Sequence, residues 1–362
     1  MKKILLKDSE KARILIRAAN WVGDAIMTTP VVRAVRKNYP KARITVLAKP
    51  WVIPVYENNP YIDEIMVYDN GGRHKKGMGV LRLSQDIRKA GFDLAILMQN
   101  AFEAALLAFL AGIPERAGYN TDARTLLLNR SVPMNPALKK KHLIAYYIGI
   151  IEGVGMRPDG MDQDLMISDQ DCHFAGQLLH EQGLGHGKPV IGINPGATGG
   201  TAKRWFPERY AELCRLLANR YQTKILVFGG PADHDLGEKI AGMAAGSCIN
   251  IAGRTGLSQA FALIRACDLF VTNDSGLMHA AAALGTRQAA LIGSTDPVAT
   301  APFSDRSTMV RMPVPCSPCL KKECPVDHKC MDLIGVDRVF QICKSILDNN
   351  TSTDSNGETN PV

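Results

Sequence analysis

The sequence predicts an α/β protein built from two doubly wound domains. Three observations support this fold class: short apolar runs alternate with helix-forming segments, the alternation resumes after a polar stretch, and 362 residues exceed what one core usually organises. We expect a first domain over residues 1–170 and a second over 171–347. Residues 348–362 lack apolar content and are expected to be a disordered tail.

The first half of the chain contains four apolar runs with the length of strands. Helical patterns such as AIMTTPVVRAVRKNYP and AFEAALLAFLAG follow them. Strands that alternate with helices of this length are typical of a parallel sheet covered on both faces. The expected strands lie at residues 12–18, 43–48, 64–69 and 92–98.

The second half repeats this pattern after the polar stretch at residues 157–171, which has the turn formers and acids of a linker. In this fold class ligands bind beyond the carboxyl ends of the strands. We therefore expect two sheets that face one another across a ligand-binding cleft. The expected strands lie at residues 189–194, 224–228, 248–253 and 268–272, with a last one near Ile292.

The bulk composition indicates a protein with an anionic partner. The formal net charge is +8, which would suit nucleic acid, a membrane surface or a phosphorylated substrate as the partner. A basic surface that serves only solubility is the alternative. The chain has no stretch near 18 consecutive apolar residues and no secretory leader pattern. We therefore expect a cytoplasmic protein.

Four of the nine cysteines gather in the segment CSPCLKKECPVDHKC. A CxxC followed by two more cysteines in a cytosolic chain favours a metal clip over disulfides. The spacing differs from that of a standard zinc ribbon, and a reduced or oxidisable surface loop is the alternative. If zinc binds here, we expect a structural role for it, with the ligands Cys316, Cys319, Cys324 and Cys330.

Several familiar enzyme signatures are absent. No GxGxxG follows the first strand, and GxxxxGK[ST], HExxH and GxSxG do not occur. Acidic DxD triplets do occur, as a metal-chelating nucleotide-sugar site would need. The two at residues 162–164 and 169–171 lie in the expected linker, where solvated acids are the better interpretation.

The segment FVTNDSGLMHAAAALG ends a buried strand and begins a helix. A helix N-terminus attracts phosphate oxygens, Ser275 adds a hydroxyl, and Gly276 allows close approach to the backbone. Capping of the helix by Asp274 or Ser275 is the alternative. His279 lies one turn further, where a packed histidine is expected unless it faces the cleft.

Two further turns of the second half have suitable chemistry. The segment NPGATGGTAKRWFPERY combines glycines, hydroxyls and cations before a helix, and Thr198 and Lys203 in it would suit a diphosphate. In FGGPADHD, Asp233 would suit ribose hydroxyls. The alternatives are an ordinary glycine-rich loop and helix capping.

The first half offers a carboxylate instead. The turn NWVGD places Asp24 between the first strand and the first helix. The helix N-terminus favours its ionised form, so that Asp24 can accept a proton from a substrate hydroxyl. Capping of the helix is again the alternative.

Together these segments, in this order over residues 12–292, resemble glycosyltransferase family 9. The resemblance implies two Rossmann-like domains in the GT-B arrangement. It also implies an inverting glycosyltransferase that moves L-glycero-D-manno-heptose from ADP-L-glycero-β-D-manno-heptose to the lipopolysaccharide inner core, as the second heptose. It implies no catalytic metal or other required cofactor.

Matched by position, Asp24 is the general base of this family, and Lys203 both contacts the diphosphate and stabilises the departing ADP. Thr198 is the second diphosphate contact, and Asp233 falls where an acid binds the nucleoside. The remaining donor residues form the D[ST]GxxH motif, which comprises Asp274, Ser275, Gly276 and His279. The cysteine cluster departs from the best-known members.

The implied acceptor is a Kdo- and heptose-bearing lipid A, an acidic glycolipid, rather than a nucleic acid. Basic side chains would contact its sugars or the cytoplasmic face of the inner membrane, where the protein would bind peripherally. A solvated basic loop is the alternative. The candidates in the loop GGRHKKGMG are Arg73, Lys75 and Lys76, with Arg33, Arg36 and Lys37 on the preceding helix.

Two other functions are compatible with these residues. One is a related glycosyltransferase, or a nucleotide-sugar epimerase, that uses a different donor. The other is a non-catalytic glycolipid- or nucleotide-binding assembly protein.

Overall fold

The structure is a computed structural model that describes residues 4, 6, 10–75 and 77–349. The chain divides into two compact units, Met1–Met166 and Ile167–Val362. The predicted domain boundary at residue 171 falls inside helix α6 (Asp169–Glu181), whose N-cap is Ser168. Most of the predicted tail, residues 350–362, lies outside the described residues.

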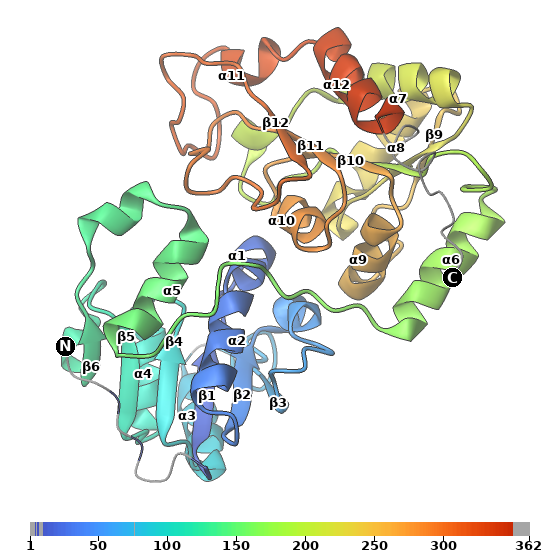
Figure 1. The fold of residues 1–362 in the computed structure, drawn as a ribbon. Helices are drawn as coiled ribbons and strands as arrows, with labels where there is room; N and C mark the ends of the chain where they lie inside the picture. Colours follow the sequence, from blue (N-terminus) through green and yellow to red (C-terminus); the bar gives the residue numbers. More distant parts are fainter. Residues whose placement is uncertain (1–3, 5, 7–9, 76, 350–362) are drawn as a thin grey trace, which may run out of the picture. The chain divides into compact units, whose positions relative to one another are not determined.

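Unit 1 contains a parallel six-stranded sheet with the strand order β3-β2-β1-β4-β5-β6 (Figure 1). All four predicted strands are present, and β5 and β6 are additional. These two escaped prediction because ERAGY and RSV carry arginine and lack an apolar run. The strands are β1 (Arg13–Arg17), β2 (Arg43–Ala48), β3 (Glu64–Val67), β4 (Leu94–Leu97), β5 (Glu115–Tyr119) and β6 (Arg130–Val132).

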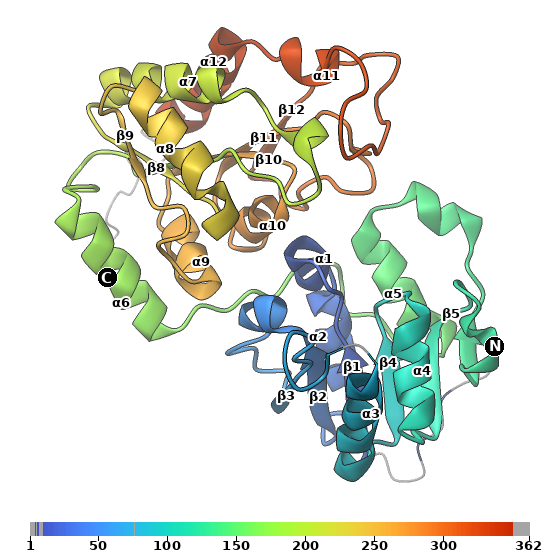
Figure 2. The ribbon, with the colours of Figure 1, turned by 180° about the vertical axis from the view of Figure 1, so that it is seen from behind.

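Helices cover both faces of this sheet. Helices α3 and α4 pack together over a core that includes Leu15 and Leu97, while α2 and α5 pack against each other. Figure 2 shows the sheet and its helices from behind. The helices of unit 1 are α1 (Val22–Met27), α2 (Thr29–Asn38), η1 (Pro50–Val55), α3 (Met78–Ala90), α4 (Phe102–Leu110), η2 (Arg124–Leu126), η3 (Pro136–Lys140) and α5 (Leu143–Gly153).

The predicted first helix is divided at Thr28. Thr28 ends α1 and is the N-cap of α2, and its hydroxyl donates to the carbonyl of Ala25 at 2.7 Å. Pro30 has no N–H group to continue the α1 ladder, so the break falls just before it. Helix α1 is therefore a short element that ends close to the turn carrying Asp24.

Unit 2 contains a second parallel six-stranded sheet, in the order β12-β11-β10-β7-β8-β9. The five predicted strands are present, and β12 is additional because its segment STMV is short and half polar. The strands are β7 (Ile191–Asn194), β8 (Ile225–Val227), β9 (Cys248–Asn250), β10 (Leu269–Asn273), β11 (Gln288–Leu291) and β12 (Ser307–Val310).

The core of unit 2 lies between this sheet and helices α7, α8 and α12, with Trp205 and Tyr210 fully buried in it. Helix α9 packs against α6 and α10. The remaining helices are η4 (Thr201–Lys203), α7 (Pro207–Tyr221), η5 (Pro231–Asp233), α8 (His234–Met243), α9 (Leu257–Arg265), α10 (Gly276–Ala283), α11 (Lys329–Asp332) and α12 (Val336–Asp348).

The two sheets share one topology. Counted in chain order within each unit, both run 3-2-1-4-5-6, so each unit is a doubly wound α/β domain. The strand order reverses between β1 and β4 in unit 1 and between β7 and β10 in unit 2. In this fold class ligands bind at such a switch point, beyond the carboxyl ends of the strands.

Contacts of the stretch before α6 show that one of its acids is not solvated. Asp164 is not solvated: it pairs with Arg33, its backbone N–H donates to Thr29 Oγ1 at 2.8 Å, and burial raises its pKa. Arg33 and Lys37 also bond Asp159, and Arg36 pairs with Asp63. Arg33 and Lys37 therefore bond the outgoing segment of unit 1, whereas Arg36 bonds the stretch before β3. Contact of these cations with an acceptor stays a prediction.

Candidate active site

Two buried asparagines organise the switch point of unit 2. Asn194 ends β7, and its side-chain N–H group donates to Thr272 Oγ1 at 3.1 Å and to Ser275 Oγ at 2.8 Å. Asn273 ends β10 and donates to the carbonyl of Pro195 at 2.7 Å. Each amide therefore ties the end of its own strand to the turn that follows the neighbouring strand.

Both asparagines were missed by sequence reasoning. Their signal was present, because an Asn follows an apolar run at each of the two strand ends. An asparagine at a strand end can bond the next turn only if the two strands are neighbours in the sheet. Strands β7 and β10 are neighbours, with Thr272 paired to Asn194.

Ser275 and Gly276 open helix α10. Ser275 is the N-cap residue, and its Oγ accepts from the N–H of Met278 at 3.4 Å. The capping alternative therefore holds for Ser275, and Gly276 is the first helical residue. His279 is buried within α10, as expected for a packed histidine.

Asp274 forms an ion pair with Lys203. The Asp274 side chain is buried, with the residue 4% exposed, and its Oδ2 lies 3.1 Å from Lys203 Nζ. An ammonium group has three donors, and this bond takes one of them. The pair thus fixes a positive charge, about a quarter exposed, beside the start of α10.

The loop that carries Thr198 and Lys203 is built around glycines. Gly200 has φ +124°, and a Cβ atom there would lie 2.1 Å from the carbonyl oxygen of Lys322, so only glycine fits. The N–H of Ala202 donates to the same carbonyl at 3.0 Å. Thr198 is exposed on this loop.

Asp233 has the capping role that was its alternative. Its Oδ2 accepts from the N–H of Gly230, the N-cap residue of η5, at 3.2 Å, and it makes no side-chain cap bond to α8. The carboxylate packs so closely on Gly196 that a Cβ there would lie 2.6 Å from it. Arg204 is the nearest cation, 3.5 Å from Oδ1. The nucleoside-binding role stays a prediction.

The cysteine segment forms hydrogen bonds with the loop that carries Lys203. Besides the bond from Ala202 to Lys322, His328 Nε2 lies 2.9 Å from the carbonyl oxygen of Ala202. The four predicted zinc ligands line one cavity of about 120 Å³. Burial and the neighbouring thiols raise the pKa of Cys330.

Among the residues that the structure describes, no three histidine, cysteine or acidic side chains are arranged to hold a metal ion. The cysteines are present as free thiols. The structural zinc stays a prediction.

In unit 1, Asp24 lies in the first turn of α1, just beyond the carboxyl end of β1. It is half-buried, and its Oδ1 accepts a hydrogen bond from the hydroxyl of Tyr147 in α5 at 2.8 Å. The N-cap residue of α1 is Trp21, which makes no side-chain cap bond. A carboxylate with one buried donor and a helix N-terminus beside it is suited to accepting a proton.

Aromatic and cationic side chains surround this edge and were missed by sequence reasoning. Trp21 and Trp51 are 60% and 47% exposed. Lys49 Nζ lies 5.1 Å from the ring centroid of Trp51, and burial, followed by the charge of Arg17, lowers the pKa of Lys49. Arg17 in turn lies over the ring of Tyr68, at 5.3 Å. Exposed rings beside cations are suited to binding an anionic sugar.

The basic loop is partly engaged in its own structure. Asp69 accepts from the N–H groups of Gly72 and Arg73, and the Arg73 guanidinium bonds Asp86 at 2.8 Å. Lys75 is exposed, and Lys76 lies outside the described residues. Contact of these cations with an acceptor stays a prediction.

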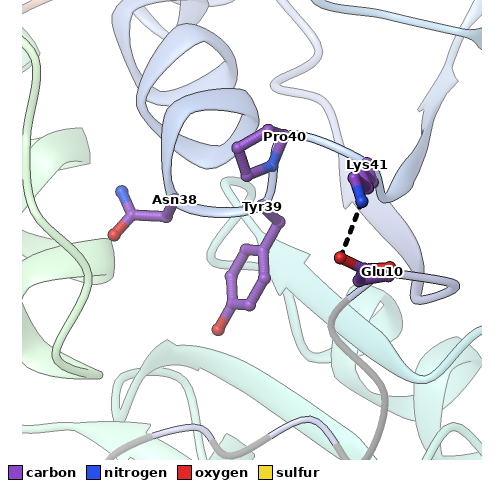
Figure 3. Close-up of a pocket in the computed structure, with 5 residues that line it drawn as sticks. All are labelled: Glu10, Asn38, Tyr39, Pro40 and Lys41. Atoms are coloured by element: carbon purple, nitrogen blue, oxygen red, sulfur yellow. Dashed lines mark hydrogen bonds and ion pairs between the residues drawn. The ribbon is translucent and has the colours of Figure 1, made fainter.

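A shallow pocket of about 180 Å³ lies elsewhere on unit 1 (Figure 3). Glu10 and Lys41 pair across it at 2.7 Å, with Tyr39 beside them. These residues precede β1 and β2, so the pocket lies at the amino ends of the strands. It is therefore at the edge opposite to Asp24, and we assign it no role in the site.

The fold and the side chains at the two switch points define a class of proteins with two doubly wound domains. One domain has a carboxylate at its switch point and the other has a lysine paired with an aspartate. The model of glycosyltransferase family 9 (heptosyltransferase) matches residues 80–330. The chain is 33% identical over 311 residues to lipopolysaccharide heptosyltransferase 2 of Salmonella typhimurium, which covers 83% of this chain and 88% of that protein. The chain belongs to glycosyltransferase family 9 and is a heptosyltransferase.

Solved structures agree with this assignment. The structure of Escherichia coli ADP-heptose LPS heptosyltransferase II matches with a TM-score of 0.79 and 31% identity, covering 94% of this chain and 99% of that one. A family 9 glycosyltransferase from Veillonella parvula matches with a TM-score of 0.82 over the same shares, at 24% identity, and supports the fold alone. The predicted GT-B fold class is confirmed.

Proposed function

We propose that this heptosyltransferase moves L-glycero-D-manno-heptose from ADP-L-glycero-β-D-manno-heptose to the inner core of lipopolysaccharide, as the second heptose, with inversion. Support comes from its relatives, since the similar Salmonella protein is a lipopolysaccharide heptosyltransferase 2 and the similar E. coli structure is an ADP-heptose enzyme. The observation that carries the proposal is the Lys203–Asp274 pair at the switch point of unit 2.

Lys203 supplies the positive charge that an ADP leaving group needs. As the glycosidic bond breaks, negative charge grows on the diphosphate, and fixed donors aimed at it lower the barrier. The ammonium group, the exposed Thr198 hydroxyl and the N–H groups at the start of α10 are such donors. Gly276 lets the diphosphate approach that backbone.

Two further donor contacts are part of the proposal. Asp233 would bind the nucleoside with the acceptor capacity that its bond to Gly230 leaves, and His279 would support the donor sugar from within α10.

Asp24 acts as the general base in this proposal. Inversion requires in-line attack of an acceptor hydroxyl on the anomeric carbon, with the proton passing to a positioned carboxylate. Such proton removal contributes about 10²- to 10⁴-fold in rate. The mechanism requires Asp24 and Lys203 to act on the same bound donor during transfer.

The proposed acceptor is a Kdo- and heptose-bearing lipid A. Trp51 and Lys49 at the edge near Asp24 offer a ring for sugar stacking and a cation for an acidic group. Arg73, Lys75 and Lys76 would add weaker contacts to the acceptor or to the anionic membrane surface.

We propose that the protein works at the cytoplasmic face of the inner membrane as a peripheral protein. Among the helices described, none has both the length and the apolar character needed to cross a bilayer. Membrane contact would therefore come from the basic loop and the bound acceptor.

The proposal includes no catalytic metal, because protein groups supply the positive charge at the diphosphate. A structural zinc in the cysteine segment remains a separate prediction, and measuring the metal content of the purified protein tests it.

The test is acceptor-dependent ADP release. Purified protein is incubated with ADP-heptose, or with UDP- and GDP-sugars, with and without heptosylated Kdo-lipid A, and the new linkage is located by NMR. We expect ADP release only with ADP-heptose and acceptor together, unchanged by a chelator. Product formed without acceptor would indicate an epimerase, and no turnover with any donor would indicate an assembly protein.

A further inference from the structure

We propose that Tyr147 is a positioning residue for the catalytic base, holding the Asp24 carboxylate in the orientation that receives the acceptor proton. This inference rests on the proposed function, because it assigns Tyr147 a task only if Asp24 is the base. Tyr147 acts through Asp24 and is not itself a catalytic residue.

The contact between the two side chains is direct and partly buried. Tyr147 comes from the middle of α5, 123 positions along the chain from Asp24, and its hydroxyl lies 2.8 Å from Asp24 Oδ1. Tyr147 is 7% exposed. A carboxylate can accept about four hydrogen bonds, so this bond leaves acceptor capacity for a substrate hydroxyl.

Tyr147 is fixed as the donor of this bond. Burial raises the pKa of Tyr147 well above its ordinary value, and the charge of Asp24 raises it further. The phenol therefore keeps its proton at neutral pH and does not compete with Asp24 as a base.

The backbone of α1 is held separately from the Asp24 side chain. Thr28, at the end of α1, bonds the hydroxyl of Tyr56 at 2.9 Å, and its own hydroxyl donates to Ala25. These bonds fix the helix, while the Tyr147 bond fixes the carboxylate on it. Loss of the Tyr147 hydroxyl should therefore change the orientation of the base more than the fold.

The titratable groups around this carboxylate come from three elements. Tyr147 and Tyr146 belong to α5, Tyr56 follows η1, and Arg17 ends β1. The three tyrosines have pKa values raised by burial, and burial lowers the pKa of Arg17 only to about 10. All of these groups keep their protons in acid, so none of them produces the acidic limb of the activity profile.

The test is Tyr147→Phe, which removes the hydroxyl and keeps the ring. A hydrogen bond donated to a carboxylate stabilises its charged form, so its loss makes protonation easier. We expect the acidic limb of the kcat profile to move up by about one pH unit and kcat at neutral pH to fall about tenfold. The KM for ADP-heptose should stay within about twofold, because Tyr147 lies on the other unit from the proposed donor site.

Tyr146→Phe is the matched control. Tyr146 is the adjacent residue of the same helix, but its hydroxyl bonds Asn100 instead of Asp24. We expect an unchanged acidic limb. An equal shift in both variants, or no shift in Tyr147→Phe, would overturn the proposal.

Two further variants keep the test decisive. If Tyr147→Phe unfolds, 2,3-difluorotyrosine is placed at position 147 instead. Its phenol is more acidic and so a stronger donor, which should move the acidic limb to lower pH. An unmoved limb refutes the inference.

Asp24→Asn separates the base role of Asp24 from the positioning role of Tyr147. If it retains turnover, the base assignment fails, whereas if it is inactive and the Tyr147 variants leave the limb in place, only the Tyr147 inference fails.

Discussion

The two switch points have the same topology and opposite chemistry. In unit 1 the turn after β1 presents a carboxylate held by a tyrosine hydroxyl. In unit 2 the loop after β7 presents the ammonium group of Lys203, which is held by the Asp274 carboxylate from the turn after β10. Both sheets run 3-2-1-4-5-6 in chain order, so strand order cannot be the cause of the difference. The topology determines where a site forms, and the turn residues determine which charge it offers.

The two sites also differ in how they are held. The Asp24 carboxylate accepts a hydrogen bond from a side chain of a distant helix. Lys203 instead lies in a loop fixed by backbone contacts to Lys322 and by the buried amide of Asn273, which bonds Pro195 and Trp205. A single substitution should therefore disturb the first site locally. The second site should respond to changes in packing well away from Lys203.

The largest expected effect comes from Asp24→Asn. We expect kcat to fall about 10²- to 10⁴-fold, because the amide cannot take the acceptor proton, while ADP affinity stays within about twofold. Single-turnover kinetics and calorimetry with ADP measure the two quantities. Glu10→Gln, at the opposite edge of the same sheet, is the control and should leave both unchanged. Weakened ADP binding in Asp24→Asn would contradict the assignment of ADP binding to unit 2 and of proton transfer to unit 1.

The next effect in size is that of Lys203→Ala, the counterpart in unit 2. We expect ADP to bind about 10- to 100-fold more weakly, because a charge-assisted contact is lost and Asp274 is left buried without its cation. Calorimetry with ADP measures this change. Lys239→Ala, which removes an exposed pair with Glu208, should bind ADP normally. Unchanged ADP affinity in Lys203→Ala would remove Lys203 from the donor site.

A smaller effect is expected from Gly200→Ala, which tests the backbone support of the unit 2 site. The new Cβ would meet the Lys322 carbonyl, and φ +124° is unfavourable for alanine, so we expect a loss of about 1–3 kcal/mol in unfolding free energy and weaker ADP binding. Denaturant unfolding measures the loss. Gly242→Ala, where nothing lies near the new methyl group in helix α8, should stabilise the protein by about 0.5–1 kcal/mol. Equal stabilities of the two variants would contradict this account.

The smallest effect is expected when Arg73, Lys75 and Lys76 are all changed to glutamine. Exposed charges are screened by salt, so the apparent KM for the acceptor should rise only a few-fold at low ionic strength and the difference should vanish at high salt. Initial rates at two salt concentrations measure it. An unchanged KM at low salt would exclude this loop from acceptor binding.

The sequence predicts the strands that have apolar runs and the turns that follow them. It does not reveal β5, β6 or β12, which are partly polar and are identified by their neighbours in the sheet. The prediction that the acids before α6 are solvated is wrong for Asp164. Its partner Arg33 lies 131 positions earlier in the chain, where no local pattern indicates the pair.

The candidate site shows the same division. Asp24 and Ser275 lie in turns that follow predicted strands, and Lys203 lies in the glycine-rich loop after another predicted strand, so the sequence alone indicates these segments. Their partners are not local: Tyr147 reaches Asp24 from another helix, and Lys322 supports the Lys203 loop from the cysteine segment. Such partnerships depend on tertiary packing and leave no spacing pattern in the chain.

The carbonyl group beneath Gly200 has a practical consequence for protein engineering. Lys322 lies between Cys319 and Cys324, in a segment whose deletion would be one way to obtain a sample with fewer accessible thiols. Deleting it would remove the Lys322 carbonyl group that accepts a hydrogen bond from Ala202 in the loop that carries Lys203. Replacing the individual sulfurs with serine, and leaving the chain length alone, is the safer route to such a sample.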